Sequence, residues 1–250
     1  MLREDLLGLE KLNGPILITG HTGFKGSWLT LLLKGLGAEV VGISLQPDGS
    51  QSLYIDGFIG EEVALEFFLD IRDRDALENA IKIARVDYVF HLAAQALVRE
   101  SYRSPEDTIE TNVMGTINVL KASQQLTDLK AQLIITTDKV YKNTGKTSGY
   151  VETEALGGQD PYSASKAMAD IATQVWMSRV SRVPTAIARA GNVFGGGDWS
   201  EDRLIPDLIR SLSNNQKLEL RFPNAIRPWQ HIIDPLYGYL LLLIKLSKTL

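Results

Sequence analysis

The sequence lacks cysteine altogether, which excludes disulfides, thiolate nucleophiles and cysteine-based metal sites and favours a reducing cytoplasm. It also lacks a basic excess, since 26 Lys and Arg stand against 30 Asp and Glu, and this balance argues against a nucleic-acid-binding protein. The most apolar late stretch, 236–246, carries Lys245 and is too short to cross a bilayer, so it predicts a buried helix. Charges interrupt the N-terminal residues, and no signal-peptide core is expected. We therefore expect a cytoplasmic protein without a metal site, nucleic-acid partner or membrane partner.

Short apolar runs alternate with longer helical patterns along most of the chain. The runs predict strands, and the patterns between them predict helices. The expected strands are 15–19, 39–44, 65–69, 86–91, 132–136 and 185–188, and the expected helices are 26–36, 73–84, 105–125 and 161–180. Because the strands are apolar on both faces, we predict a doubly wound α/β fold, a parallel sheet covered by helices on both sides. After about residue 190 the pattern loosens, which predicts a partial second, smaller lobe over 191–250, interleaved with the first unit.

A glycine-rich turn joins the first expected strand to the first helix, with Gly20, Gly23 and Gly26 at a spacing of three. Glycines at such a corner let the backbone approach a pyrophosphate that sits on the helix N-terminus. A tight turn without a ligand is the alternative. His21 and Lys25 lie inside the turn and could touch the pyrophosphate, although ordinary exposed loop positions explain them as well. The turn predicts that residues 1–190 form a dinucleotide-binding domain.

The stretch from Gly35 to Ile71 contains no Lys or Arg. A 2′-phosphate requires such a cation near the end of the second strand, so the sequence favours NAD over NADP. That strand ends at Ser44 without an acidic residue, and we expect a hydroxyl or an amide to contact the ribose. Asp70 could accept from the adenine amino group or cap a helix, but Asp73 fits the cap better.

Tyr162 and Lys166 stand four residues apart on an expected helix, so their side chains point from one face. A phenol becomes a usable base near neutrality when an ammonium and a nicotinamide cation lie beside it. An exposed Tyr–Lys contact is the alternative. Thr137, Asp138 and Lys139 follow the fifth expected strand, at the sheet edge where open α/β folds bind ligands. A polar surface turn would explain these three residues equally well.

Six motifs in this order resemble the extended short-chain dehydrogenases/reductases that act on nucleotide sugars, and closer still the CDP-glucose 4,6-dehydratase family. The motifs are TGHTGFKG, FHLAAQ, ETNVMGT, TTDKVY, YSASK and ARAGNVFGGGDW. The more specific parts are GHTGFKGSW, RPWQH, and Asp138–Lys139 where related dehydratases have Asp-Glu. The resemblance extends from about Gly14 to the end of the chain. It implies a Rossmann-like fold, NAD, CDP-glucose as substrate, a homodimer or dimer of dimers, and a place in deoxysugar and lipopolysaccharide biosynthesis.

The resemblance also implies a reaction. Tyr162 takes the sugar O4 proton while hydride passes from C4 to NAD⁺, and Lys166 holds the nicotinamide ribose and lowers the tyrosine pKa. Asp138 and Lys139 then manage loss of the C5 proton and protonation of the departing O6, and hydride returns to C6. Thr137 hydrogen-bonds the sugar near O4. Since a lysine has a higher intrinsic pKa than the usual Glu, Lys139 needs burial or a cationic neighbour to act as the C5 base.

The remaining implied contacts are small residues and amides near the dinucleotide, and a few groups near the nucleotide diphosphate. The full cofactor-binding set is Gly20, His21, Gly23, Phe24, Lys25, Gly26, Ser44, Asp70, Ile71, Ala93, Ala94, Gln95, Asn112, Tyr162 and Lys166. The substrate-binding set is Gln95, Thr137, Asn192, Arg203 and Arg227.

Two other functions stay open. A nucleotide-sugar C4 epimerase shares the glycine turn, Tyr162 and Lys166, but has no use for an acid at O6, so Asp138 favours dehydration. A truncated, non-catalytic NAD-binding protein is the other alternative, because the chain stops at Leu250 while family members continue with more of the sugar-binding lobe.

Overall fold

The computed structural model describes residues 12, 14–218, 220 and 223–248, and a parallel sheet lies at its centre. In the described chain this sheet has six strands in the order β3-β2-β1-β4-β5-β6. The strands are β1 (Ile16–Thr19), β2 (Val40–Ser44), β3 (Leu65–Phe68), β4 (Tyr88–His91), β5 (Ala131–Thr137) and β6 (Thr185–Ala190). All six expected strands are confirmed within two residues at each end. The order reverses between β1 and β4, which is the point where doubly wound sheets bind ligands.

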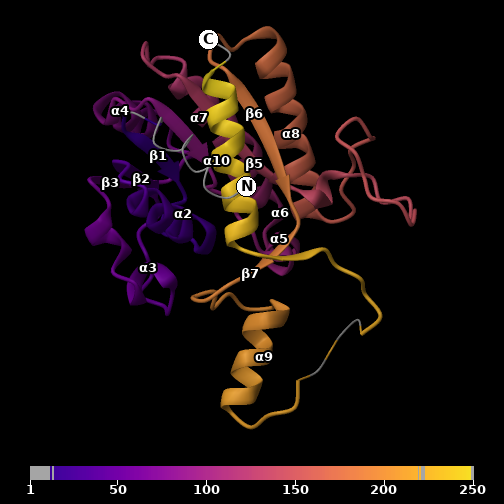
Figure 1. The fold of residues 1–250 in the computed structure, drawn as a ribbon. Helices are drawn as coiled ribbons and strands as arrows, with labels where there is room; N and C mark the ends of the chain where they lie inside the picture. Colours follow the sequence, from indigo (N-terminus) through magenta and orange to yellow (C-terminus); the bar gives the residue numbers. More distant parts are fainter. Residues whose placement is uncertain (1–11, 13, 219, 221–222, 249–250) are drawn as a thin grey trace.

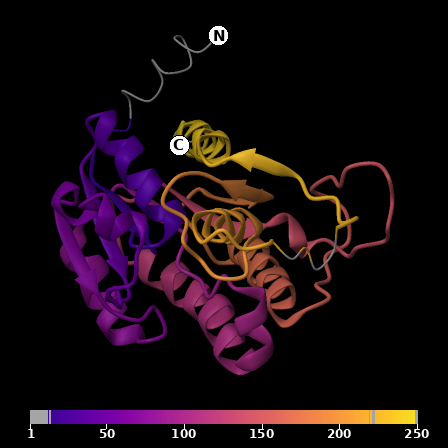
Figure 2. The same ribbon diagram turned by 90° about the horizontal axis from the view of Figure 1, so that it is seen from below.

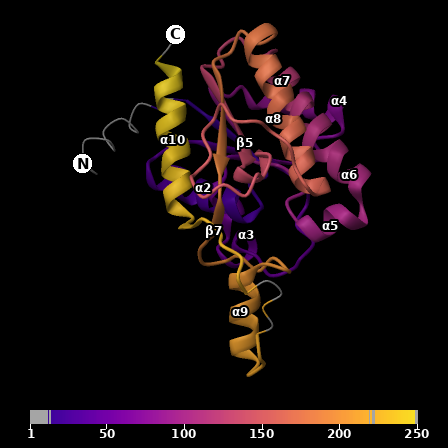
Figure 3. The same ribbon diagram turned by 90° about the vertical axis from the view of Figure 1, so that its right-hand side faces the viewer.

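Helices cover both faces of the sheet, so the expected doubly wound fold is confirmed. Figure 3 shows α10 (Ile233–Ser247) on one side and α7 (Gly115–Ser123) and α8 (Pro161–Arg179) on the other, with the sheet between them. α2 (Phe24–Gly35) shares the α10 face, and α4 (Arg74–Ala84) shares the α7 face. Two hydrophobic cores result, one on each side of β1 and β4. This is why β1 and β4 are buried at every position and largely apolar.

The expected helix over 105–125 is interrupted by a π-turn. α6 (Pro105–Ile109) continues into the π-helix η3 (Glu110–Met114), and α7 follows directly. A π-turn inserts one extra residue into the helical repeat and is common at functional sites. Here it contains the buried Asn112. The start of α8 is fixed by a capping box in which Asp160 accepts from the Ser163 backbone and the Ser163 side chain bonds back.

The sequence pattern does not predict several short elements, because three to six residues are too few for a helical period to be recognised. They are α3 (Leu53–Asp56), η2 (Ile59–Glu62), α5 (Val98–Arg103) and η4 (Asp138–Val140).

The last part of the chain leaves the sheet and then returns to it. β7 (Asn192–Phe194) pairs in parallel with β8 (Trp229–His231). α9 (Leu204–Ser213) projects from the body in Figures 1 and 3 and is seen end-on in Figure 2. α10 then packs into the first core with buried leucines, which confirms the expected buried helix over 236–246. The division into 1–190 and 191–250 stays a prediction, but α10 shares the core of the first unit. No helix within the described ranges is both long and apolar enough to cross a membrane.

The ion pair between Arg189 on β6 and Asp170 on α8 gives a first prediction. Asp170 is fully buried and accepts two hydrogen bonds of 2.8 Å from the guanidinium. Replacing Asp170 by Ala strands a largely buried cation, so we expect Asp170→Ala to lower the free energy of unfolding by about 3–5 kcal/mol. Arg74→Ala, which removes the exposed pair with Glu78, is the matched control and should change it little. Equal losses in denaturant unfolding of the two variants would contradict this account.

Candidate active site

The glycine turn between β1 and α2 is closed by close backbone approaches. Gly20 has φ +78°, and a Cβ there would lie 2.8 Å from the backbone nitrogen of Ala93. A Cβ on Gly26 would lie 2.1 Å from the Gly20 carbonyl oxygen. Gly23 is the N-cap of α2 and supplies no capping side chain, so a ligand can meet the first N–H groups of the helix. The turn therefore fits the pyrophosphate of a dinucleotide, as the spacing predicts.

The His21 side chain does not lie in a position to make the expected contact with the pyrophosphate. Its ring is fully buried, its Nε2 lies 2.8 Å from Glu66 Oε1, and a Cβ on Gly42 would lie 2.6 Å from the ring. Burial lowers the pKa of His21, although Glu66 opposes this shift. The side chain thus packs against β2 and β3, and its contacts are with the protein.

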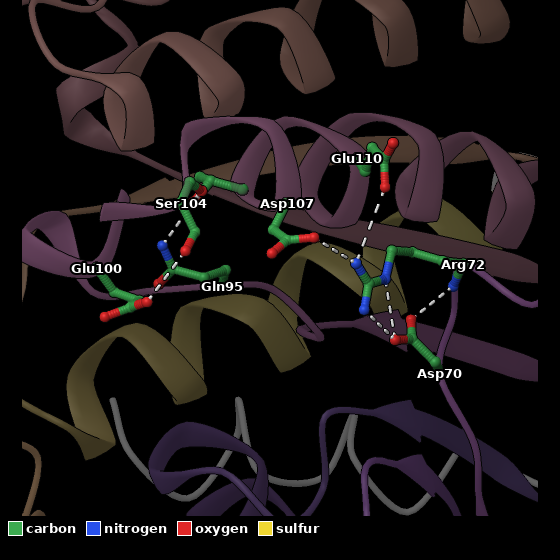
Figure 4. Close-up of polar contacts among 8 residues, drawn as sticks. Asp70, Arg72, Gln95, Glu100, Ser104, Asp107 and Glu110 are labelled. Atoms are coloured by element: carbon green, nitrogen blue, oxygen red, sulfur yellow. Dashed lines mark hydrogen bonds and ion pairs between the residues drawn. The ribbon is translucent and has the colours of Figure 1, made fainter. Parts of the chain in front are cut away.

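In the loop after β3, Arg72 binds Asp70, the residue expected to accept a hydrogen bond from adenine. Figure 4 shows Asp70 facing Arg72: one carboxylate oxygen accepts from Arg72 N at 2.8 Å, and the other from Nε and Nη2 at 2.9 and 2.7 Å. Burial raises the pKa of Asp70, but the Arg72 bonds outweigh it, so the pKa lies below its usual value. An adenine contact must therefore compete with Arg72. Asp73 caps α4 by accepting from Ala76 N, as expected.

Arg72 is the first cation after the stretch that lacks Lys and Arg, but acidic groups surround it. Besides Asp70, it pairs with Asp107 at 3.1 Å and lies 3.9 Å from Glu110 (Figure 4). A 2′-phosphate would meet these carboxylates together with the guanidinium. The surroundings of Ser44, whose hydroxyl lies 2.8 Å from that of Thr22, remain free of cationic contacts among the described residues.

Asn112 ties the segment after β4 to α8. Its side chain accepts from Gln95 N at 2.9 Å and donates to Gln95 O at 3.0 Å and Ser165 Oγ at 2.8 Å. The Gln95 side chain donates to the Thr108 hydroxyl in α6 at 2.8 Å. These bonds fix the backbone of Ala93, Ala94 and Gln95 at the carboxyl end of β4, next to the glycine turn. Ile71 is buried on the other side of the same region, against Gly115.

Tyr162 and Lys166 lie in the first two turns of α8 and face the end of β5. Lys166 is buried, and its ammonium donates to the Ile135 carbonyl at 3.2 Å. Burial and, to a lesser extent, the charge of Lys25 together lower the pKa of Lys166 to about 8. Burial raises the pKa of Tyr162 to about 12, against the opposing effects of Arg203 and a hydrogen bond with Thr137. In the protein alone, burial therefore outweighs the nearby positive charge, and the lowering of the Tyr162 pKa by Lys166 and a bound cofactor stays a prediction.

Thr137, Asp138 and Lys139 form the link from β5 into η4. The Thr137 hydroxyl accepts from Lys139 N and donates to Asp138 Oδ1 at 3.0 Å. The Lys139 ammonium lies 5.9 Å from the centre of the Tyr162 ring. Burial lowers the pKa of Lys139; Asp138 and other acidic groups oppose this shift, while cationic neighbours add to it. This is the direction that a C5 base requires. The structure thus brings the five predicted catalytic residues together.

The three residues expected at the nucleotide diphosphate occupy different surroundings. Arg203 pairs with the Asp198 carboxylate at 3.1 Å, and its charge acts on both Tyr162 and Lys139. Arg227 is exposed and also lowers the pKa of Lys139. Asn192 begins β7, beside β8. Arg203 and Arg227 therefore act on the reacting region, and their contacts with a substrate stay a prediction.

Lys25 and Tyr239 add an unexpected pair to the site. The ammonium of Lys25, in the first turn of α2, donates to the Tyr239 hydroxyl on α10 at 3.4 Å. Tyr239 lies outside every expected site set, because its stretch reads only as a buried helix. No local signal in the sequence distinguishes it, since Tyr237 carries the same hydroxyl in the same run. Among the described residues no group of three metal-ligating side chains gathers.

Residues 16–249 match the model of the NAD dependent epimerase/dehydratase family. The chain belongs to this family. A relative called CDP-glucose 4,6-dehydratase from Salmonella typhimurium is 44% identical over 92% of this chain, and a dTDP-glucose 4,6-dehydratase from Neisseria gonorrhoeae is 32% identical over 88%. The chain spans 66% of the length of each of these relatives, just under two thirds.

Solved structures agree with the family fold. A dTDP-glucose 4,6-dehydratase from Streptomyces venezuelae, with NAD bound, is 26% identical and has a TM-score of 0.80 over 92% of this chain and 72% of its own. An epimerase from Methanothermobacter thermautotrophicus has a TM-score of 0.83 over 96% of this chain and 70% of its own, at 23% identity, and shows the shared fold alone.

The glycine turn generates the second prediction. Since a Cβ on Gly26 would overlap the Gly20 carbonyl, we expect Gly26→Ala to open the turn and weaken NAD⁺ binding at least tenfold in calorimetry. Gly35→Ala is the matched control on the same helix, because a Cβ there meets nothing within 4 Å. That control should keep its affinity and gain slightly in stability. Normal NAD⁺ binding by Gly26→Ala would rule out the turn as the pyrophosphate site.

Proposed function

We propose that this protein is an NAD-dependent nucleotide-sugar 4,6-dehydratase that converts CDP-glucose to CDP-4-keto-6-deoxyglucose. The observation that carries the proposal is the placement of Asp138 and Lys139 beside Tyr162 at the end of β5. A C4 epimerase requires hydride to leave and return at one carbon, so it has no use for that second acid–base pair. The name of the Salmonella relative supports CDP-glucose as the substrate. The motifs that resemble the same family support it independently.

NAD fits the residues at the glycine turn. The tight backbone of Gly20 and Gly26 leaves room for a diphosphate, and the carboxylates around Arg72 disfavour the 2′-phosphate of NADP. When bound, NAD⁺ supplies a reversible hydride acceptor for the sugar C4, and the same hydride returns to C6. Lys166 would hold the ribose at the nicotinamide end. The small residues Ala93 and Ala94 leave space beside it.

The first step in this proposal removes hydrogen from C4 and O4. Tyr162 takes the O4 proton, while Thr137 orients the oxygen by a hydrogen bond. A tyrosine with a pKa near 12 is a poor base at neutrality, so the step requires additional positive charge. The positive nicotinamide ring and the ammonium of Lys166 are the two sources of that charge. Oxidation therefore begins only when cofactor and sugar are both bound.

The second step eliminates water across C5 and C6. With C4 a ketone, the C5 proton is acidic. The neutral amine of Lys139 takes this proton, and burial favours that neutral amine because it lowers the pKa of the ammonium form. Asp138, in its protonated form, gives its proton to O6, so that water leaves and a C5–C6 double bond forms. The proton taken from O4 by Tyr162 is the net source that reprotonates Asp138 by the end of the cycle, so the protons balance. Hydride then adds at C6, and a proton returns to C5. Water is the net loss, and no cofactor is consumed.

A homodimer is part of the same proposal. Exposed apolar side chains lie along α6, η3 and α8, on the face away from the sheet. They are Ile109, Met114, Met168, Ile171 and Val175. A two-fold axis beside these helices would bury them in a four-helix contact. A cytoplasmic location and a place in deoxysugar biosynthesis, including that of lipopolysaccharide, complete the proposal, since the product is a 6-deoxy sugar and the chain has no cysteine.

The division of labour at the site gives the third prediction. Incubation with CDP-glucose and NAD⁺ should yield a product lighter by one water. Tyr162→Phe should abolish hydride transfer, so no NADH absorbance appears in a single turnover. Asp138→Asn should leave C4 oxidation largely intact while slowing elimination about 10²-fold or more, so enzyme-bound NADH accumulates. Lys139→Met should stop exchange of solvent deuterium into C5 while oxidation persists.

The outcomes separate the alternatives. Return of a C4-inverted sugar without water loss would establish an epimerase instead. Binding of NAD⁺ with no turnover of any nucleotide sugar would favour the non-catalytic alternative. If Asp138→Asn blocks oxidation as completely as Tyr162→Phe, then the carboxylate acts in the first step or through geometry, and its assignment to O6 is wrong.

The fourth prediction concerns the dimer. Val175→Asp places a charge in the centre of the α8 contact, so we expect sedimentation at micromolar concentration to show a monomer for this variant and a dimer for the unaltered protein. Ile83→Asp is the control, because Ile83 is similarly exposed but lies on α4. It should remain dimeric. A monomeric unaltered protein would refute the arrangement.

A further inference from the structure

The short element η4, which carries Asp138 and Lys139, is too small to be stable by itself. It is a single 3₁₀ turn of three residues, and its closing bond, from Tyr141 N to the Asp138 carbonyl, is long at 3.4 Å. One turn of helix fixes several backbone dihedral angles in return for one hydrogen bond. The places of the Asp138 and Lys139 side chains therefore depend on contacts between η4 and other elements.

Arg189 on β6 makes such a contact, in addition to its ion pair with Asp170. Its Nε and Nη2 each donate to Asp170 at 2.8 Å, while Nη1 donates to the Tyr141 hydroxyl and to the Glu152 carbonyl, both at 3.0 Å. The guanidinium is a planar fork, and the Asp170 bonds fix one edge of it. The other edge therefore holds Tyr141 in a defined place, directly after η4.

The 141–158 loop joins the end of η4 to the start of α8 and folds back on itself. Tyr141 and Leu156 form an antiparallel bridge, which closes the loop where it leaves η4. Gly158 lies so close to α8 that a Cβ there would be 2.1 Å from Ala164 N. Arg189 bonds both legs of the loop. The loop thus connects the two elimination residues on η4 to the oxidation residues on α8, and Arg189 fixes that connection.

The end of β6 approaches η4 at a second point. Two residues after Arg189, a Cβ on Gly191 would lie 3.5 Å from Asp138 Oδ2 and 2.9 Å from the Pro228 side chain. The Asp138 carboxylate therefore lies near the backbone of the same strand end that carries Arg189. Its other oxygen accepts from the Thr137 hydroxyl at 3.0 Å. The end of β6 thus supports η4 twice, beside the carboxylate and through the guanidinium.

We propose that Arg189 is a positioning residue for the elimination of water: through the Tyr141 hydroxyl it holds η4, and with it the two residues that act on C5 and O6. This inference rests on the proposed function and concerns its second step alone. The residues that oxidise C4 stand on α8, whose start is fixed by its own capping box. An ion pair that only fastens β6 to α8 is the alternative, and it predicts no difference between the two steps.

Tyr141→Phe tests the inference with a small change and gives the fifth prediction. It removes the hydroxyl that accepts from Arg189 but keeps the ring, which stacks on Tyr150 with centroids 5.1 Å apart. We expect elimination to slow about tenfold, because the acid and the base lose a bond that positions them. In a single turnover with CDP-glucose, NADH should form at the normal rate within about twofold and then persist, since oxidation is intact and water loss is delayed.

Tyr150→Phe is the matched control on the same loop. Its hydroxyl accepts from Thr144 N at 3.0 Å and makes no bond to Arg189, and the ring remains to stack on Tyr141. We expect both steps to proceed at the rate of the unaltered protein. A Tyr150→Phe variant that slows elimination as much as Tyr141→Phe would assign the effect to the loop as a whole and not to Arg189.

Arg189→Lys is the second variant. A lysine keeps a charge for Asp170 but lacks the fork that bonds Asp170 and Tyr141 at once. It should slow elimination at least as much as Tyr141→Phe while oxidation persists. If Arg189 acts through the Tyr141 hydroxyl, then adding Tyr141→Phe to Arg189→Lys should slow elimination no further.

The remaining outcomes decide against the inference. Unchanged steps in Tyr141→Phe would mean that its bond to Arg189 positions nothing, and equal slowing of oxidation and elimination would make the bond structural. Should Tyr141→Phe fail to fold, the two steps of Arg189→Lys decide in the same way, and if neither variant folds the network is structural and the inference is wrong. An unaltered protein that forms no NADH with CDP-glucose and releases no water refutes the proposed function instead, which is a distinct result.

Discussion

The close approach of two backbones at the carboxyl edge of the sheet is the constraint on which the site depends. Gly20 lies so near the segment after β4 that a Cβ would collide with Ala93, and the Thr19 hydroxyl accepts from Ala93 N at 3.3 Å just below. The same hydroxyl lies 2.7 Å from the buried His91, whose pKa burial lowers to about 3, so the ring is neutral. A neutral, fully bonded layer therefore supports the turn from beneath, and charged groups are confined to the cleft above it.

Within that cleft, amines are crowded and partly desolvated. Lys25, Lys139 and Lys166 all have lowered pKa values with burial as the largest cause, and in each case at least one other cation contributes. Asp138 is the carboxylate that acts on two of them. The diphosphates of the proposed cofactor and substrate would reduce the repulsion among these cations. In the proposed reaction, burial also gives Lys139 the lowered pKa that proton abstraction requires.

The sequence pattern predicts the sheet well because the strands are short and mostly apolar and are separated by helical patterns or turn residues. It predicts Tyr162, Lys166 and the residues after β5 because helical spacing and strand ends place them locally. The pattern does not predict which residues the long side chains contact. His21 is buried against Gly42 instead of facing a ligand, and Arg72 engages Asp70, since both outcomes depend on contacts between segments distant in sequence. Tyr239 could not be predicted as a site residue for the same reason, because nothing local in the sequence distinguishes it from the core residues around it.

The return of α10 to the sheet links the late part of the chain to the chemistry. Its leucines fill the core beside β5 and β6, so the register of the helix is set by burial of apolar surface. That register in turn places the Tyr239 hydroxyl opposite Lys25, and a rotation by one residue would remove the hydrogen bond and bury the hydroxyl unpaired. Core packing on this face and the position of the Lys25 charge are therefore coupled. Conservative changes among the α10 leucines should disturb the site through this charge before they disturb the fold.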